Sequence, residues 1–203
     1  GIPTMKMQLA QDVEEAVMWF RQIQQPVALK VAAEEIPHKS DIGGVLLNLT
    51  TETEIRAGYE SIMERALAVH PDAKIDGVHV QRMVPTGQEV IVGAVQDPQF
   101  GPLVMFGSGG IEVEGLKDVA FALAPLTNLE AEDMLASTWA GRKLKGFRNL
   151  PPADREAVLD ILLRLAQLAA DHPQIAEIEV NPLRVLAEGE GAVAVDVRIR
   201  KEG

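Results

Sequence analysis

The order in which strand-like and helix-like segments follow one another is the feature of this chain that most limits its fold. At first, apolar runs with a period of two alternate with segments whose apolar residues recur every three to four positions. Later, strand-like runs follow each other directly, and Asp97-Pro98 and Gly101-Pro102 are typical of a hairpin connection. This order predicts an α+β chain of two lobes, residues 1–84 and 85–203, that meet near Val84-Pro85-Thr86-Gly87.

Local signals give approximate bounds for these segments. Thr51-Glu52-Thr53-Glu54 and Thr127-Asn128-Leu129-Glu130 have the pattern of a capping box, which begins a helix. Helices are expected over residues 12–20, 51–70, 127–139 and 153–170. Strands are expected over residues 27–31, 44–49, 78–84, 89–96, 103–106, 175–186 and 192–199, and a flexible glycine loop over residues 107–110.

Composition excludes several classes of protein. With 203 residues, 47% of them hydrophobic, the chain can build a substantial core. The formal net charge of −11 argues against a nucleic-acid surface, which needs a basic stripe, and against an anionic membrane. The absence of cysteine excludes disulfides and thiolate chemistry, and no apolar run reaches the ~18 residues of a membrane span. We therefore expect a cytoplasmic protein, and the start at Gly1 without Met indicates a domain cut from a longer chain.

Acidic and amide side chains gather near the C-terminus. Glu177, Glu179 and Asn181 share one face of the expected strand because successive side chains alternate. If the next strand pairs with this one, Asp196 approaches Glu179 and Asn181. Two carboxylates ~4 Å apart repel by roughly 4 kcal/mol at an effective dielectric of ~20, so a cation or a proton must offset the repulsion. Oxygen ligands without His or Cys favour Mg²⁺ or Ca²⁺.

The expected last strand, residues 192–199, suggests surface ion pairs as the alternative to a metal site. It is expected to bury three valines and to turn Asp196 and Arg198 to its other face. The three valines are Val193, Val195 and Val197. In that arrangement the carboxylates could instead form surface ion pairs with Arg198 or Arg184.

The segment His38-Lys39-Ser40-Asp41-Ile42-Gly43-Gly44-Val45 places five kinds of functional group directly after an apolar strand. The backbone N–H groups of Gly43 and Gly44 could face a phosphate, and His38 could accept a phosphoryl group or act as an acid or base. The alternative is a hinge turn in which Asp41 caps its own backbone. Lys30, on an otherwise small and apolar strand face, must reach an anion or extend to water.

Two other segments have weaker patterns. The glycine cluster of residues 107–110 is followed by no Gly-Lys-Ser/Thr, so it is not a Walker A loop, and a strand bulge explains it equally well. A basic island follows the third expected helix, as a solvated loop or an element that closes over anions; it consists of Arg142, Lys143, Lys145 and Arg148.

Six motifs, taken in order, resemble the ATP-grasp domain of NDP-forming acyl-CoA synthetases, relatives of the succinyl-CoA synthetase β subunit. The resemblance covers nearly the whole chain and implies the ATP-grasp fold, in which two α+β lobes hold ATP between them. The motifs are Val27-Ala-Leu-Lys-Val31, His38-Lys-Ser-Asp-Ile-Gly-Gly-Val45, Gly87-Gln-Glu-Val-Ile-Val-Gly93, Asp97-Pro-Gln-Phe-Gly-Pro102, Gly107-Ser-Gly-Gly-Ile-Glu-Val-Glu114 and Glu177-Ile-Glu-Val-Asn-Pro-Leu183.

The resemblance also implies roles for single residues. Lys30, with Gly43 and Gly44, would contact nucleotide phosphates. Gln81, Arg82 and Met83 would form the adenine hinge, and Glu89 would lie at the nucleotide site. Glu179, Asn181 and Asp196 would bind Mg²⁺. His38 resembles the histidine that takes part in phosphoryl relay between the nucleotide and a phosphohistidine elsewhere.

The reaction implied for the family is acid + CoA + ATP ⇌ acyl-CoA + ADP + phosphate. Only the nucleotide half belongs to the ATP-grasp domain, so CoA-binding and ligase domains or subunits are expected as partners and the chain alone should not complete the reaction. A second hypothesis is a non-catalytic regulatory or ligand-sensing module fused to a protein such as an acetyltransferase. A third is a carboxylate–amine ligase of the wider ATP-grasp class, which would place no phosphoryl acceptor at position 38.

Overall fold

The computed structural model describes residues 1–36, 39–109 and 118–201, and the chain divides into two compact units. The N-terminal unit is Met5–Met83. The C-terminal unit consists of the chain from Val84 onward together with Gly1–Thr4.

The first four residues belong to the C-terminal unit, although the sequence pattern placed them in the first lobe. The backbone N–H of Ala194 donates to the carbonyl oxygen of Pro3 at 2.9 Å, and Thr4 forms a parallel bridge with Ala194. Backbone pairing to a distant strand leaves no periodic signal in a short segment, so the pattern could not reveal it.

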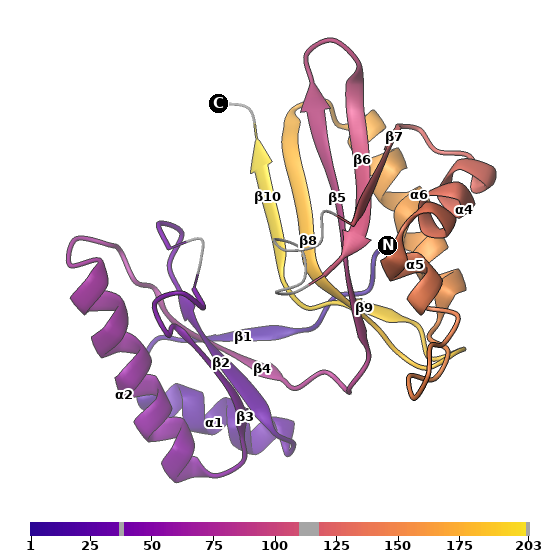
Figure 1. Cartoon of the computed structure of the whole chain (residues 1–203). Coiled ribbons are helices and arrows are strands. Elements are labelled where there is room, and N and C mark those ends of the chain that lie inside the picture. The colour runs from indigo at the N-terminus through magenta and orange to yellow at the C-terminus, as the bar shows by residue number, and fades with distance from the viewer. Residues whose placement is uncertain (37–38, 110–117, 202–203) are drawn as a thin grey trace. The chain divides into compact units, whose positions relative to one another are not determined.

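The N-terminal unit is a four-stranded antiparallel sheet with two helices on one face (Figure 1). Its strand order is β1-β4-β2-β3. The buried side chains of Leu29 and Val80 pack there with Ile55 and Ile62 of the longer helix. The elements are β1 (Met7–Ala10), α1 (Val13–Ile23), β2 (Val27–Ala32), β3 (Val45–Leu49), α2 (Glu52–Val69) and β4 (Gly77–Arg82).

The C-terminal unit is a larger antiparallel sheet, also covered by helices on one face (Figure 1). The strand order is β10-β8-β5-β6-β7, and β9 pairs with β8. Its core includes Phe106, Leu162, Leu165 and Val180. The elements are β5 (Gln88–Asp97), β6 (Gly101–Ser108), β7 (Val119–Leu123), α4 (Asn128–Ser137), α5 (Trp139–Lys143), α6 (Arg155–Asp171), β8 (Ile175–Val185), β9 (Ala192–Ala194) and β10 (Val197–Lys201).

Both predicted capping boxes are confirmed. The Thr51 hydroxyl accepts from the Glu54 N–H at 3.2 Å, and the Glu54 carboxylate accepts from the Thr51 N–H at 2.9 Å. Thr127 and Glu130 repeat the arrangement at the start of α4. These side chains satisfy N–H groups that have no partner within the helix.

Several expected bounds were wrong. The strands β1 and β7 were not expected, because each is short and lies at a sheet edge, where alternation is weak. The expected strand over 192–199 is divided into β9 and β10. Gly107 and Ser108 belong to β6 rather than to a loop. Gly109 follows β6 and donates its N–H to the Glu89 carbonyl at 3.4 Å. Gly110, the last residue of the cluster, lies outside the described residues.

The buried face of the closing strand is also the reverse of the expectation. Ala192 and Ala194 are buried, whereas Val197 is 42% exposed and Val193 is only partly buried. The pairing explains this, because Ala192 and Ala194 lie opposite Val185 and Leu183, which point into the core.

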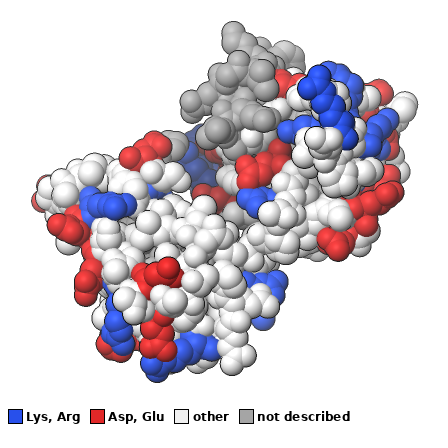
Figure 2. Space-filling model, turned by 60° about the horizontal axis from the view of Figure 1, so that its bottom comes forward, with Lys and Arg blue, Asp and Glu red and all other residues white. Residues whose placement is uncertain are grey.

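Two further observations concern membrane spans and surface charge. Within the described residues, no helix is long and apolar enough to cross a membrane. On the face shown in Figure 2, basic side chains are interspersed with acidic ones, so this face does not present a field of one sign.

The capping box of α2 provides a direct test of the N-terminal unit. Replacing Thr51 by Ala removes the acceptor for the Glu54 N–H and should lower the free energy of unfolding by about 1 kcal/mol. Thr53→Ala, on an exposed position two residues later, should leave stability unchanged or slightly raised. Urea unfolding followed by Trp19 fluorescence in a Trp139→Phe background reports on this unit, since the chain has only two tryptophans. Equal stabilities of the two threonine variants would contradict the assignment.

Candidate functional site

The face of the N-terminal sheet opposite α1 and α2, called its uncovered face because none of the described helices packs on it, holds Lys30, His79 and Gln81. Lys30 lies directly opposite His79 in the pairing of β2 with β4, and Gln81 lies two residues farther along β4 on the same face. The neighbours Leu29 and Val80 point to the other face, into the helix-covered core. Strand alternation therefore separates an apolar face from a face with nitrogen and amide groups.

Gln81 is a buried polar side chain on this face. It is 2% exposed, and its Oε1 has no hydrogen-bond partner among the described residues. A buried acceptor without a donor costs roughly 1–3 kcal/mol, so stability alone does not favour glutamine at this position. Of the other expected hinge residues, Arg82 is exposed and Met83 donates its N–H to the carbonyl of Pro26 at 2.9 Å.

The segment after β2 forms a hydrogen-bonded turn. The N–H of Gly43 donates to Ser40 O at 3.0 Å, and the N–H of Gly44 donates to Lys39 O at 2.8 Å. The two N–H groups expected to face a phosphate are thus used within the turn, which corrects that part of the expectation. Gly43 has φ +66°, and a Cβ on Gly44 would lie 2.9 Å from Lys39 O, so the turn itself requires both glycines. His38 lies outside the described residues.

The charges around His79 are mostly positive. Burial, followed by the nearby Lys39 and Lys30, lowers the pKa of the His79 imidazole below its usual value, and Asp76 opposes this effect. The imidazole is therefore neutral at pH 7, beside two ammonium groups.

The uncovered face of β8 contains the expected acidic set. Glu177, Glu179 and Asn181 alternate with the buried Ile178 and Val180. The N–H of Asn181 donates to the carbonyl of Asp196 at 3.1 Å, so the predicted approach of Asp196 to Asn181 is confirmed at the backbone. The amide Nδ2 of Asn181 lies 3.5 Å from Glu179 Oε1.

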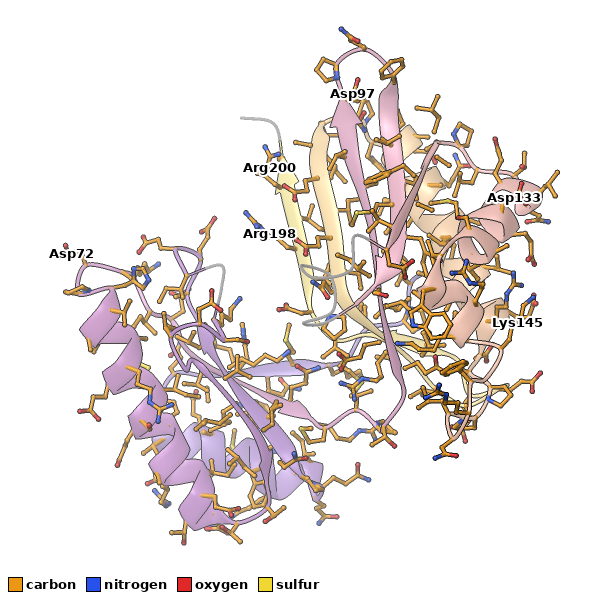
Figure 3. The ribbon with its side chains drawn as sticks, in the orientation of Figure 1. Asp72, Asp97, Asp133, Lys145, Arg198 and Arg200 are labelled. Atoms are coloured by element: carbon orange, nitrogen blue, oxygen red, sulfur yellow. The ribbon has the colours of Figure 1, made fainter. Side chains whose placement is uncertain are left out.

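One carboxylate of the set forms a surface ion pair, but with neither of the two arginines that were expected, Arg198 and Arg184. Arg200 pairs with Glu177 at 3.1 Å, and Arg198 and Arg200 project from the edge strand β10 (Figure 3). None of the ion pairs found within residues 1–36, 39–109 and 118–201 involves Glu179. In the same part of the chain no three acidic or histidine side chains gather as a metal site would need. The expected donor set is smaller: two carboxylates and one amide, all oxygen donors of the kind that Mg²⁺ accepts.

Glu89 has a partner of its own. It lies opposite Arg184 in the pairing of β5 with β8 and forms an ion pair with it. The Arg184 side chain is only 22% exposed, so the pair is partly shielded from water. Arg184, which was considered as a partner of the Glu177–Asn181 set, is therefore engaged elsewhere.

On the uncovered face of the C-terminal sheet, side chains change from charged to apolar across the strands. Two cross-strand rows show this change: one contains Glu179 and the other Glu177, and both end in apolar residues on β6 and β7. The rows are Arg198–Glu179–Gly93–Met105–Phe121 and Arg200–Glu177–Val95–Leu103–Leu123. Phe121 and Leu123 are 54% and 49% exposed, so an apolar surface lies beside the acidic set.

Asp118 is a structural residue that the sequence patterns did not reveal. Its carboxylate accepts from the N–H groups of Trp139 and Ala140 at 2.6 and 2.7 Å and from the Ser108 hydroxyl at 2.9 Å. Burial would raise the pKa of Asp118, but these three hydrogen bonds together lower it. Asp118 thus joins the end of β6 to the start of α5, and its partners are 10 to 22 residues away in the sequence, which local patterns cannot detect.

A cavity of about 740 Å³ lies within the C-terminal unit, between the start of β5, the end of β8 and the turn before α6. Apolar residues such as Leu150, Pro151 and Ala187 line most of it, and Glu89 is the only expected site residue among them. The cavity is therefore distinct from the acidic set on β8.

Comparisons with known proteins agree with one another. The family model described as an ATP-grasp domain matches residues 1–200. The β subunit of ADP-forming acetate–CoA ligase I of Pyrococcus furiosus is 44% identical over 199 residues, which are 98% of this chain and 85% of that protein. The chain spans only 28% of a longer relative, the ADP-forming acetate–CoA ligase I of Archaeoglobus fulgidus, at 44% identity over 95% of this chain.

Solved structures of an acetyl-coenzyme A synthetase of Candidatus Korarchaeum cryptofilum match as well. A complex with coenzyme A and Ca-AMPCP has a TM-score of 0.94 at 42% identity, covering 100% of this chain and 87% of that one. A second complex, with coenzyme A, Mg-AMPPCP and a phosphohistidine segment pointing towards the nucleotide binding site, has a TM-score of 0.84 at 40% identity, covering 100% and 86%.

The Asp118 hydrogen bonds predict a pH-dependent loss of stability. Asp118→Asn should destabilise the C-terminal unit at pH 7 by roughly 1–3 kcal/mol, since buried N–H groups lose a charged acceptor. The folded-state pKa lies below the ordinary value of 3.8; the carboxylate therefore stabilises the fold above that value, and the difference from wild type should shrink as the pH falls through the lowered pKa. Urea unfolding followed by Trp139 fluorescence in a Trp19→Phe background measures it.

A matched control is Asp133→Asn, an exposed change on α4 (Figure 3) that should leave stability within about 0.5 kcal/mol. If the two asparagine variants were equally stable at pH 7, the anchoring role of Asp118 would be wrong.

Proposed function

The chain belongs to the ATP-grasp domain family, and from this premise we propose that it is the nucleotide-binding, phosphoryl-transferring part of an ADP-forming acyl-CoA synthetase. The overall reaction is acid + CoA + ATP ⇌ acyl-CoA + ADP + phosphate. Two relatives that are each 44% identical to the chain are CoA ligases, so neither the regulatory module nor the carboxylate–amine ligase is proposed.

The observation that carries the proposal is the oxygen set on the uncovered face of β8. Asn181 bonds the Asp196 backbone and lies beside Glu179, and this carboxylate is in no ion pair among the described residues. A partly buried carboxylate that arginine does not neutralise, such as Glu179, is suited to a hard cation. Glu179, Asn181 and Asp196 would hold Mg²⁺, which, when bound, neutralises charge on phosphate oxygens.

The N-terminal unit supplies groups for the nucleotide itself. The Lys30 ammonium would offset phosphate charge, and Gln81, with Arg82 and Met83, would contact the base. The Gln81 amide oxygen is buried and has no donor among residues 1–36, 39–109 and 118–201, which supports a contact to a group such as an exocyclic amine. Glu89 would contact the nucleotide while Arg184 holds its carboxylate in place. Gly43 and Gly44 would act through the turn that they form, since their N–H groups are already bonded.

The phosphoryl step needs a nucleophile, and His38 is the proposed one. A neutral ring nitrogen of His38 attacks the γ-phosphorus, the bond from that phosphorus to the bridging oxygen of ADP breaks, and ADP leaves. The resulting phosphohistidine then passes its phosphoryl group to the histidine of a partner. A relative's structure contains such a phosphohistidine segment.

The CoA-binding and ligase functions belong to a partner subunit or to fused domains. Two forms of relative support this: a separate β subunit of which the chain spans 85%, and a long chain of which it spans 28%. The exposed apolar side chains of Phe121 and Leu123 on the edge strand β7 would suit a protein partner.

Removal of one carboxylate tests the cation set. Glu179→Gln should weaken the binding of Mg-ADP roughly tenfold or more, because changes at metal sites commonly cost that much even outside the ligand shell. Binding of ADP in EDTA should change little. Glu177→Gln is the matched control, since Glu177 lies two residues away on the same face and is paired with Arg200. Calorimetric titration of the full chain measures both; equal losses for the two variants would refute the assignment.

Labelling tests the nucleophile. Incubation of the full chain with γ-labelled Mg-ATP should give label that is lost in acid and retained in base, as expected for a phosphohistidine. His38→Ala should abolish this label, while His172→Ala, an exposed position after α6, should retain it. Equal labelling of the two variants would remove His38 from the mechanism.

A further inference from the structure

We propose that Lys30, Lys39 and His79 form an anion site on the uncovered face of the N-terminal sheet, and that His79 takes up a proton when nucleotide phosphates bind there. The inference rests on the proposed function, since it takes the anion to be the phosphate chain of that nucleotide. It adds two residues, Lys39 and His79, to the expected nucleotide contacts.

The backbone places the three nitrogen groups together. His79 in β4 lies directly opposite Lys30 in β2, and side chains in such a pair have Cβ atoms roughly 4.5–5.5 Å apart. Lys39 is held near the same strand by the turn, because Gly44 accepts from the Val31 N–H and donates to Lys39 O, each at 2.8 Å. Lys39 therefore comes from a different segment and faces the same part of the sheet.

The described elements around His79 contribute charged and apolar groups to its surroundings. Lys30 comes from β2 and Lys39 from the turn, and Asp76 precedes β4. On the other side β1 contributes Leu9, which carries no charge. Helices α1 and α2 lie on the opposite face of the sheet with the buried core. Among the described residues, two cations and one carboxylate thus act on the ring, so the potential that these groups produce there is positive.

This arrangement couples anion binding to a proton. In the free protein, burial and the two lysines keep the pKa of His79 low, and the ring is neutral at pH 7. A bound phosphate chain brings negative charge next to the ring, which offsets the lysines and raises the pKa of His79. The protonated ring then donates hydrogen bonds and adds a third positive charge. Because binding and protonation favour each other, nucleotide affinity should fall as the pH rises.

The simpler alternative is that His79 only fills space on the sheet. A partly buried aromatic ring between Lys30 and Leu9 would do so without titrating. The two explanations differ in one measurable quantity, the number of protons taken up when the nucleotide binds.

Calorimetric titration of the full chain with Mg-ADP at pH 6.5, in two buffers of different ionisation enthalpy, gives that number. ADP contributes its own ionisation equally to every variant, so differences between variants isolate the protein. Wild type should take up more protons than His79→Asn, and between pH 6 and pH 8 its affinity should fall roughly fivefold more than that of the variant. His172→Asn, an exposed control, should behave as wild type.

Adenosine is the second probe, because it has the base and ribose but no phosphate. It should bind wild type without the extra proton. Equal uptake with adenosine and Mg-ADP would overturn the assignment to phosphate, and equal uptake by wild type and His79→Asn would overturn the role of His79. Absence of Mg-ADP binding to wild type would overturn the proposed function, and this inference with it.

A measurement on the unaltered protein covers the case in which His79→Asn does not fold. Nuclear magnetic resonance titration of the four histidine rings follows the pKa of each one directly. Saturating Mg-ADP should raise the pKa of the His79 ring. An unmoved His79 would overturn the inference.

Discussion

Among the described residues, helices cover each sheet on one face only, and the proposed chemistry depends on that constraint. Alternation along a strand sends every second side chain to the uncovered face, so polar groups can be placed there without disturbing the core. In β2 and β4 this separates Lys30, His79 and Gln81 from Leu29 and Val80. In β8 it separates Glu179 and Asn181 from Ile178 and Val180.

The consequence is two sets of opposite character. In the proposed function, the nitrogen groups of the N-terminal sheet would bind anions, and the oxygen groups of the C-terminal sheet would bind a cation. A nucleotide with its magnesium ion has both needs, because phosphate oxygens must be neutralised by ammonium groups and by metal. Two neighbouring carboxylates on β8 differ in their partners. Arg200 neutralises Glu177, whereas among the described residues no ion pair includes Glu179.

Much of the fold and of the site could be predicted from the sequence, and the failures have physical causes. Capping boxes and strand faces are local, so Thr51 with Glu54, and Glu179 with Asn181, were predicted correctly. Asp118 could not be found, because its partners are distant in sequence and the signal lies in backbone N–H groups. The prediction that the N–H groups of Gly43 and Gly44 face a phosphate was wrong, because the turn uses both groups. Glycine permits several roles, so the sequence could not distinguish between them. The roles of His38, Lys30 and the hinge residues stay predictions.

The central claim is that residues on the helix-free sheet faces bind the nucleotide, and that Glu89 is the one expected site residue among those that line the 740 Å³ cavity. Backbone amide chemical shifts of the full chain, recorded with and without Mg-ADP, test it most directly. The account predicts large shifts for Lys30, Gln81, Glu179 and Asn181, and small ones for the cavity residues Ala153 and Ala187. Shifts confined to the cavity, or none at saturating Mg-ADP, would contradict it.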